Sequence, residues 1–412
     1  MELSLVILAV VFILIAVRQV GRFRFRIWQV MCAGAVAVLL TGQISPDDAI
    51  HAVDIQVMVF LLGMFILGEA LAESGYLYSL AGSLVSGCRD SSRFIMVFIL
   101  SMALLSAFLM NDTVAIIGTP LALYFGRRMG IDIKMLLLSL CFAVTTGSVA
   151  SPIGNPQNLL VATGSGFESP FVTFFLYLAL PTVLSLILLV VFIRAYYPAE
   201  HARKIEASPD LCVVDRDLTR IVKVSLLLVV VCIILQIALA SRPFGIEYTM
   251  PLSFIAVAGA APIVLFSRKR VSLVRNIDWP TLVFFISLFV LMAAVFSTGF
   301  FQQLVPSTAS SSVAVLYLTS LVISQFISNV PFVALFNPLL VGAGMSAAEA
   351  MALAAGSTLA GNLTILGAAS NVIVIQNAEK QGETLTFTEF IRLGVPFSTV
   401  TGIIFIAWLS FI

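Results

Sequence analysis

Charged residues are scarce in this sequence. Asp, Glu, Lys and Arg make up 10% of its 412 residues, whereas an ordinary globular domain has about 25%. Apolar residues of the AVILMFWYC set reach 60%, and the mean hydropathy is +1.10. So few polar groups could not cover the surface of a folded chain in water. The composition therefore excludes a soluble protein and indicates an integral membrane protein, which we expect to be all-α.

Histidine and cysteine are also few, which excludes several kinds of site. The two histidines, His51 and His201, lie in polar stretches, and no HExxH pattern occurs. Neither histidine nor lysine lies at membrane depth to activate a nucleophile, so we predict neither an enzyme nor a cofactor. The net charge of +1 gives no support for a nucleic-acid partner. Without a CxxC pair, we expect free thiols rather than disulfides or a zinc site at Cys32, Cys88, Cys141, Cys212 and Cys232.

Apolar stretches without Lys and Arg mark the membrane segments. A spanning helix needs about 20 residues, and two stretches, 94–125 and 312–345, are too long for one span and too short for two. If both are re-entrant hairpins, 21 of the 22 Lys and Arg residues lie on one side of the membrane. If both cross the membrane once, 9 of these residues lie on one side and 13 on the other. Positive residues gather on the cytoplasmic side, so we predict two hairpins. The ten predicted transmembrane helices are 3–17, 27–41, 55–72, 135–162, 171–193, 224–240, 249–267, 280–301, 350–376 and 393–412.

The first stretch is followed by Arg18 and further arginines and preceded by none, which is the reverse of a signal peptide. We therefore expect a retained first span with its N-terminus outside the cell. An even number of spans then places the C-terminus outside as well, in a multi-pass protein of the plasma membrane.

One sizeable polar stretch, 194–223, divides the chain into two halves. It is too short for a separate soluble domain, so we interpret it as a cytoplasmic linker between a first repeat, 1–193, and a second repeat, 224–412. The two halves match in three segments taken in the same order. These pair 54–76 with 278–300, 106–111 with 324–329, and 153–158 with 366–371.

Each half has five predicted spans and one hairpin, which enters from the cytoplasm in 94–125 and from outside in 312–345. Because five is odd, the second half must enter the membrane from the opposite face. The sequence thus predicts an inverted-topology repeat, which is the usual architecture of secondary transporters.

Helix-breaking residues recur at membrane depth in both halves. They lie midway along each hairpin, at 110–113 and 328–331, and again at 151–158 and 361–371. In the second hairpin we expect the break at Val330, because Pro331 follows it. Broken backbone at that depth must line a cavity or be buried in protein. Free carbonyls and Asn oxygens there suit a small cation, and free N–H groups suit an anion, so we predict the two sites side by side.

The candidate site residues follow from these breaks. Thr145, Thr146, Ser148 and Thr358 are expected only to hydrogen-bond between helices. The first half-site would consist of Asn111, Asp112, Thr113, Gly154, Asn155 and Asn158, with a Na⁺ position at Asn111, Asp112 and Asn155. The second half-site would consist of Ser328, Asn329, Thr364, Gly367, Ser370 and Asn371.

Asp112 stands out among them. No Lys, Arg or His lies at membrane depth to pair with it, and a charged Asp there costs at least about 3 kcal/mol. We expect Asp112 to bind a cation or to exchange protons. A role as an N-terminal helix cap is compatible with either.

These motifs resemble those of the ion transporter superfamily. The group includes arsenite-efflux permeases, citrate–metal symporters, NhaD-type sodium/proton antiporters and divalent anion/sodium symporters, and the chain is similar to YbiR-like permeases. The divalent anion symporters carry Ser-Asn-Thr at both tips, whereas here an acid enters the first tip and Val330 replaces Thr in the second. An Asn-Asp tip resembles the arsenite permeases. The matching segments are Asn111-Asp112-Thr113, Gly154-Asn155-Pro156-Gln157-Asn158, Ser328-Asn329-Val330-Pro331 and Gly367-Ala368-Ala369-Ser370-Asn371.

The residues and the resemblance together predict a secondary active transporter of a small anion, a carboxylate or an oxyanion, coupled to Na⁺ or H⁺. A Na⁺/H⁺ antiporter and an arsenite-type efflux permease stay open as alternatives. The expected partners are the small-molecule or ion substrate and the lipid bilayer, and the resemblance implies a homodimer.

Overall fold

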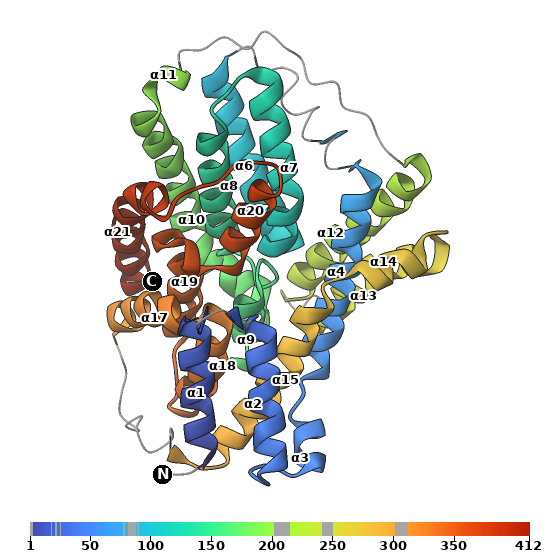
Figure 1. Cartoon of the computed structure of the whole chain (residues 1–412), viewed down its shortest axis with the longest axis vertical. Coiled ribbons are helices and arrows are strands. Elements are labelled where there is room, and N and C mark those ends of the chain that lie inside the picture. The colour runs from blue at the N-terminus through green and yellow to red at the C-terminus, as the bar shows by residue number, and fades with distance from the viewer. Residues whose placement is uncertain are drawn as a thin grey trace.

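The computed structural model describes residues 3–17, 19–20, 23–24, 26–76, 79–80, 88, 90–201, 215–240, 250–300 and 312–412. These residues are almost entirely helical (Figure 1), apart from a short antiparallel pair, β1 (Gln19–Val20) and β2 (Phe23–Arg24). The first half contains α1 (Leu3–Val17), α2 (Ile27–Leu40), α3 (Pro46–His51), α4 (Ile55–Ser74), α6 (Ser91–Leu109), α7 (Asn111–Met129), α8 (Ile133–Ser148), α9 (Pro156–Gly164) and α10 (Pro170–Tyr196). The rest contains α11 (Pro198–His201), α12 (Arg216–Ala240), α13 (Leu252–Phe266), α14 (Arg270–Asn276), α15 (Trp279–Phe296), α17 (Val313–Ile327), α18 (Asn329–Gly342), α19 (Ala347–Leu363), η2 (Ile365–Gly367), α20 (Ala369–Glu379) and α21 (Phe387–Phe411).

Six of the described helices are long and apolar enough to cross a membrane: α4, α6, α10, α12, α15 and α21. Large apolar side chains on the outer faces of α10 and α12 are exposed, for example Phe175 (67%) and Leu227 (62%). Exposing such faces to water costs about 25 cal/mol per Å², whereas lipid removes that cost. The predicted all-helical membrane fold is confirmed, while the count of ten spans stays a prediction.

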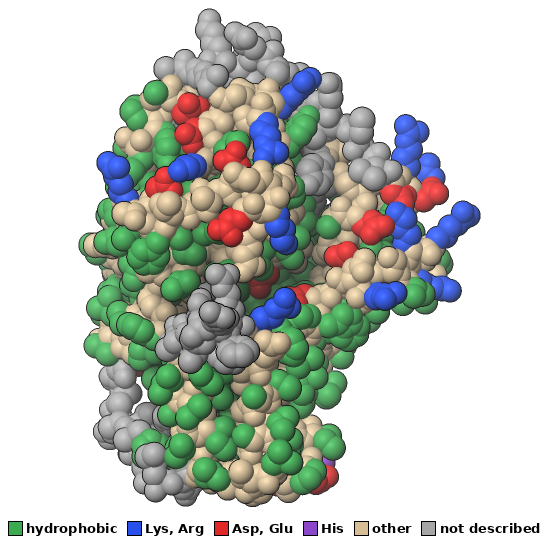
Figure 2. Space-filling view, in the orientation of Figure 1, with side chains coloured by type: hydrophobic (Ala, Val, Ile, Leu, Met, Phe, Trp, Pro, Cys, Tyr) green, Lys and Arg blue, Asp and Glu red, His purple; other side chains and the backbone are tan. Residues whose placement is uncertain are grey.

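Charge is distributed unevenly over the surface. Figure 2 shows Lys and Arg side chains gathered over the upper end and the right-hand side of the molecule, whereas its lower end is mostly hydrophobic. Such a one-sided distribution is what the positive-inside rule produces in a membrane protein. The assignment of the basic side to the cytoplasm stays a prediction.

Both long apolar stretches fold into two helices that meet at a sharp turn. α6 and α7 meet at Met110, and α17 and α18 meet at Ser328. α8 packs against both arms of the first hairpin, and α19 packs against both arms of the second. Glycine allows this close approach, because a Cβ on Gly147 of α8 would collide with the backbone of Ala103, and one on Gly356 of α19 would lie 2.5 Å from the carbonyl oxygen of Tyr317.

The two halves also contact each other in exchanged pairs. α13 packs against α4 while α15 packs against α2, and α20 packs against α7 while α18 packs against α9. In the predicted repeat α2 corresponds to α13, α4 to α15, α7 to α18 and α9 to α20, so each contact has its counterpart. An approximate two-fold relation produces this pattern. The residue boundaries of the repeats, 1–193 and 224–412, stay a prediction.

Two boundaries differ from the sequence prediction. α12 begins at Arg216, inside the predicted linker 194–223, because the Asp215 side chain accepts a hydrogen bond from the backbone N–H of Leu218 and so caps the helix. Part of that linker, 202–214, lies outside the described residues. The second hairpin breaks at Ser328 rather than Val330, since Pro331 falls in the first turn of α18, where a missing N–H loses no helical hydrogen bond.

Candidate functional site

The two hairpin tips share an unusual backbone conformation. Among the described residues, Met110 (φ 69°) and Ser328 (φ 71°) are the non-glycine residues with positive φ. This conformation costs about 1–3 kcal/mol for a residue with a Cβ. It reverses the chain within a single residue, so the second arm of each hairpin begins at once with Asn111 or Asn329.

The first tip is attached to the unwound turn between α8 and α9. The backbone N–H of Asn111 donates to the carbonyl oxygen of Gly154 at 2.8 Å. The Asn111 side chain accepts from the backbone N–H of Asp112 at 2.9 Å. Gly154 is required in this turn, because a Cβ there would collide with the carbonyl of Ser148. The predicted meeting of a hairpin tip and an unwound helix is therefore present in the first half.

Two asparagines hold this unwound turn in shape. Asn155 caps α9 by accepting from the backbone N–H of Asn158 at 2.8 Å, and its amide donates to Ser148 Oγ and to Thr358 Oγ1. The amide of Asn158 donates to the carbonyls of Ser148, Val149 and Ser151 at 3.0–3.1 Å. Both side chains are fully buried. Both side chains therefore take part in the structure of the turn, and the Na⁺ position at Asn111, Asp112 and Asn155 stays a prediction.

Thr358 of α19 connects this turn to the second half. Its hydroxyl donates to Asn158 Oδ1 at 3.0 Å and accepts from the amides of Asn155 (3.2 Å) and Gln157 (3.3 Å). Asn362, one helical turn further, donates to Thr146 Oγ1 at 3.0 Å. These side chains therefore form a buried polar network across the contact of α8, α9 and α19.

The turn between α19 and α20 resembles the turn between α8 and α9, but more of its buried polar atoms lack a hydrogen-bond partner among the described residues. The amide of Asn371 donates to the Gly361 carbonyl, as Asn158 does to that of Ser148, and a Cβ on Gly367 would collide with the Ala360 carbonyl. Thr364 Oγ1 donates to Gln325 Oε1 at 2.7 Å. Four buried oxygens here have no hydrogen-bond partner among the described residues: Asn329 Oδ1, Asn362 Oδ1, Ser370 Oγ and Asn371 Oδ1. Unpaired buried oxygens are acceptors that a cation or a donor group would satisfy.

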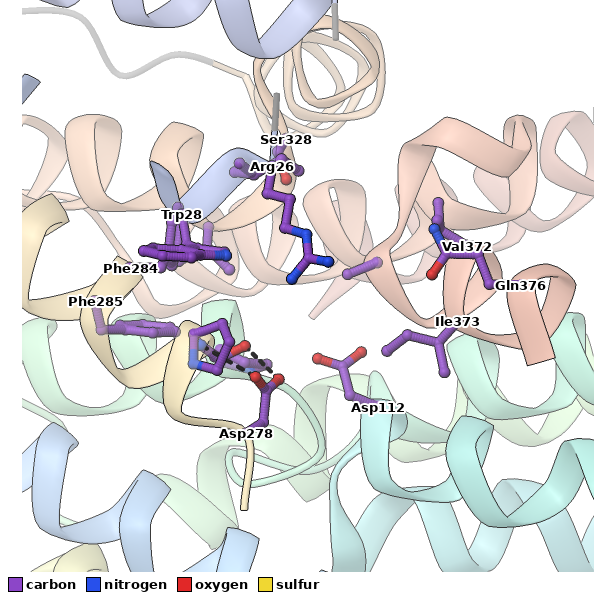
Figure 3. Close-up of a pocket in the computed structure, with 16 residues that line it drawn as sticks. Arg26, Trp28, Asp112, Asp278, Phe284, Phe285, Ser328, Val372, Ile373 and Gln376 are labelled. Atoms are coloured by element: carbon purple, nitrogen blue, oxygen red, sulfur yellow. Dashed lines mark hydrogen bonds between the residues drawn. The ribbon is translucent and has the colours of Figure 1, made fainter. Parts of the chain in front are cut away.

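A cavity of about 950 Å³ lies where the tips and the downstream half-helices meet. Its wall includes Asp112 of the first tip, Ser328 and Val330 of the second tip, and the first residues of α9 and α20, Pro156 and Ala369. Figure 3 shows Asp112 and Asp278 directed into the cavity from one side and Arg26 reaching into it from the other. Both halves of the chain therefore contribute to one chamber.

Asp112 and Asp278 differ in their partners. Asp278 caps α15, accepting from the backbone N–H and the hydroxyl of Thr281 at 3.2 and 2.6 Å. The Asp112 carboxylate has no hydrogen bond or ion pair with any described residue, and Met110 rather than Asp112 occupies the cap position of α7. A second, smaller chamber of about 110 Å³ adjoins Asp112 and is also lined by Glu69, Thr113 and Asp278. An unpaired carboxylate beside both chambers is a position for a cation or a proton.

The predicted site residues thus fall into three groups. Asp112 and Ser328 line the large cavity, and Thr113 lines the small chamber. Asn329, Ser370 and Asn371 are buried with unpaired oxygens. The remaining residues form the turns and their hydrogen bonds: Asn111, Gly154, Asn155, Asn158, Thr364 and Gly367.

Several cavity residues were not among the sequence candidates. Arg26, Trp28 and Gln376 line the cavity although they lie outside every break. Arg26 belongs to the arginine-rich segment 18–26, which was predicted to be a cytoplasmic loop after the first span. Among the described residues no group of three or more His, Cys, Asp and Glu side chains is arranged to hold a metal ion.

Known proteins resemble this chain along almost all of its length. A "46 kDa membrane protein" of Mycobacterium leprae is 26% identical over 89% of this chain and 90% of its own length. An uncharacterized transporter of Mycobacterium tuberculosis is 29% identical over 90% of each chain. The P protein of Mus musculus is 24% identical over 95% of this chain and 58% of its own length.

Two solved structures share the fold. MtrF of Neisseria gonorrhoeae superposes with a TM-score of 0.60 at 16% identity, over 99% of this chain and 94% of its own. The YdaH transporter of Alcanivorax borkumensis superposes with a TM-score of 0.61 at 17% identity, over 99% and 96%. The sequence profile described as "Citrate transporter" matches residues 9–356. This match, over most of the chain and across both hairpins, shows that the chain belongs to the citrate transporter family of membrane transporters.

Proposed function

We propose that this membrane transporter is a secondary active carrier that moves a small anion, a carboxylate or an oxyanion, together with Na⁺ or H⁺. The observation that carries the proposal is the position of Asp112. Its carboxylate has no partner among the residues that the structure describes, and it lies at the first hairpin tip in a cavity that the second tip also lines. Because a charge at that depth needs a partner, a coupling ion that occupies Asp112 during part of the cycle would meet the need.

The charges in the cavity give a reason for coupling. With both carboxylates ionised, Arg26, Asp112 and Asp278 carry a formal sum of −1, which opposes the entry of an anion. A Na⁺ or a proton at Asp112 brings the sum to zero. Binding of the cation would therefore strengthen binding of the anion, and the reverse follows by linkage. If one net positive charge enters per cycle, each 100 mV supplies about 2.3 kcal/mol, which corresponds to about fifty-fold accumulation.

Two other functions use the same residue. In a Na⁺/H⁺ antiporter, Asp112 would bind the two cations in turn and no anion would be needed. Outward transport is the other candidate, since MtrF, which shares the fold, is described as belonging to a class of antimetabolite efflux pumps, and an arsenite-type permease would also work outward. Arg26 in the cavity favours an anionic cargo over simple cation exchange. Membership of a transporter family is consistent with our proposal that the chain catalyses no reaction.

Flux measurements on the purified protein in proteoliposomes test the proposal. Uptake of labelled citrate, succinate, sulfate and arsenite would be followed under an imposed Na⁺ or pH gradient. We expect saturable uptake of at least one anion, driven by one of the two gradients, with counterflow that a channel would not show. Cation exchange at a fixed sodium gradient that no anion alters would instead identify an antiporter.

We also propose a homodimer in the plasma membrane with both termini outside. A Ser410→Cys variant in a background without the five native cysteines would react with a membrane-impermeant maleimide in intact cells if the C-terminus is outside. Cross-linking of the membrane-embedded protein would show the dimer.

A further inference from the structure

We propose that Arg26, Trp28 and Gln376 form an anion-recognition subsite in the cavity wall, which takes a carboxylate or oxyanion group of the cargo. The inference rests on the proposed function and adds the residues that would hold the anion. All three line the cavity of about 950 Å³, and none of them belongs to a hairpin tip or to an unwound turn.

Arg26 supplies the charge. Its guanidinium reaches into the cavity while Asp112 and Asp278 point toward it from the opposite side (Figure 3). Among the described residues, no carboxylate forms an ion pair with it. Its backbone is anchored at the start of α2, where its N–H donates to Gln29 Oε1 at 3.2 Å. An arginine is charged at every physiological pH and presents a planar set of donors that matches a carboxylate.

Trp28 supplies an independent observation. Its indole Nε1 is buried and has no hydrogen-bond partner among the described residues, although the residue lines the cavity two positions after Arg26. An indole nitrogen is only a donor, and a buried donor without an acceptor is costly. A cargo oxygen near Arg26 would satisfy it.

Gln376 of α20 adds an amide on the side of Arg26 away from Trp28 in Figure 3. Much of the remaining wall is apolar, with Phe284, Phe285 and Ile373. One side of the cavity thus presents donors, and the other presents the carboxylates of Asp112 and Asp278. This separation gives the anion and the coupling cation different positions in one chamber.

Substitutions at two of these positions test the subsite in reconstituted full-length protein. The probes are labelled citrate and succinate, with uptake measured at saturating Na⁺ and proton gradients. We expect Arg26→Gln to raise the KM for both probes about tenfold or more, in line with the loss of a charged hydrogen bond, and Arg26→Lys to restore part of it. Trp28→Phe keeps the ring and removes the N–H, and should raise KM about threefold to tenfold. Arg270→Gln, at an exposed arginine of α14 outside the cavity, is the matched control and should leave KM unchanged.

The outcomes separate the subsite from the transport function. If the wild type takes up a probe and Arg26→Gln shows the same KM for that probe, the subsite is overturned and the carrier proposal stands. Equal increases in KM for Arg26→Gln and Arg270→Gln would also overturn it, because they would reflect general surface charge. Wild-type protein that takes up no anion under any gradient would overturn the proposed function and the subsite together.

Discussion

Thr358 and Asn158 join the two halves of the chain at the centre of the molecule. The Thr358 hydroxyl donates to Asn158 Oδ1 at 3.0 Å, and both side chains are buried. The same hydroxyl accepts hydrogen bonds from the side-chain amides of Asn155, which precedes α9, and Gln157, in the first turn of α9. One side chain of the second half therefore completes the hydrogen bonds of a broken helix in the first.

Thr358→Val should consequently destabilise the protein strongly. The change keeps the shape of the side chain but leaves the side chains of Asn155, Gln157 and Asn158 with missing partners. Each unpaired buried group costs about 1–3 kcal/mol, so we expect a loss of about 3 kcal/mol or more. Thermal unfolding of the purified protein in detergent would measure it. Thr163→Val is the control, because among the described residues the Thr163 hydroxyl bonds only to carbonyls of its own helix. An equal effect of the two changes would contradict the role given to Thr358.

Ser328→Gly should stabilise the protein. Ser328 has φ 71° and ψ 152°, a region that glycine occupies freely and other residues at a cost of about 1–3 kcal/mol. Glycine loses about 0.5–1 kcal/mol through its more flexible unfolded state, so we expect a net gain of about 1 kcal/mol. The hydroxyl makes no capping hydrogen bond that would be lost. Chemical unfolding of Ser328→Gly, Ser328→Ala and Ser328→Val should rank the three in that order of decreasing stability, and a less stable glycine variant would speak against strain at this tip.

Most of the backbone breaks could be predicted from the sequence because they depend on local chemistry. Clusters of proline, glycine and asparagine favour a break at membrane depth, and the expected interruptions lie between α6 and α7, α8 and α9, α17 and α18, and α19 and α20. Single prolines such as Pro120 and Pro181 lie instead within continuous helices. Only the position of one break was wrong, because Pro331 is compatible with the first turn of a helix.

The roles of the individual side chains could be predicted less well, because they depend on distant neighbours. Asn155 and Asn158 lie at a break, as a ligand would, and their side chains also form hydrogen bonds to Ser148 and Thr358, which the sequence did not indicate. Arg26 was interpreted as a charge at the membrane surface, whereas the packing of α2 against α15 places it in the cavity. No local pattern distinguishes an arginine that faces solvent from one that faces a chamber.

Lys269→Gln should lower stability slightly and flatten its pH dependence. Lys269 Nζ lies 2.8 Å from Glu73 Oε1 and 3.2 Å from Asp215 Oδ2, which connects the ends of α4 and α12 to the loop before α14. The hydrogen bonds to Glu73 and Asp215 raise the pKa of Lys269. Hydrogen bonds from the Leu218 backbone and from Lys269 lower the pKa of Asp215. These side chains are partly exposed, so we expect a loss of about 1 kcal/mol or less at neutral pH.

The direction of the pH effect follows from these shifts. Because the pKa of Lys269 is raised on folding, its contribution is complete below its unfolded pKa of about 10.4 and disappears as the pH rises through the folded value. Because the pKa of Asp215 is lowered, its contribution is complete above about 3.9 and disappears as the pH falls through the folded value. Unfolding midpoints between pH 3 and 11 would show both flanks reduced in Lys269→Gln. Arg220→Gln, which removes a pair whose side chains are 81% and 82% exposed, should leave the profile nearly unchanged; a similar profile in both variants would refute the prediction.

Asp112→Asn should uncouple transport without harming the fold. The Asp112 carboxylate has no partner among the described residues, so the isosteric amide breaks no hydrogen bond and removes a partly buried charge. We expect unfolding temperatures close to those of the wild type, together with a loss of the dependence of uptake on the Na⁺ or pH gradient. Initial rates in proteoliposomes, measured with and without each gradient, would show it. The matched control is Asp278→Asn, which weakens a helix cap to Thr281 and should cost about 1 kcal/mol while keeping the coupling. The two acids share one chamber, and uptake depends on the ion gradient only through the carboxylate that binds the ion. Coupling that survives in Asp112→Asn and fails in Asp278→Asn would therefore assign the ion to Asp278.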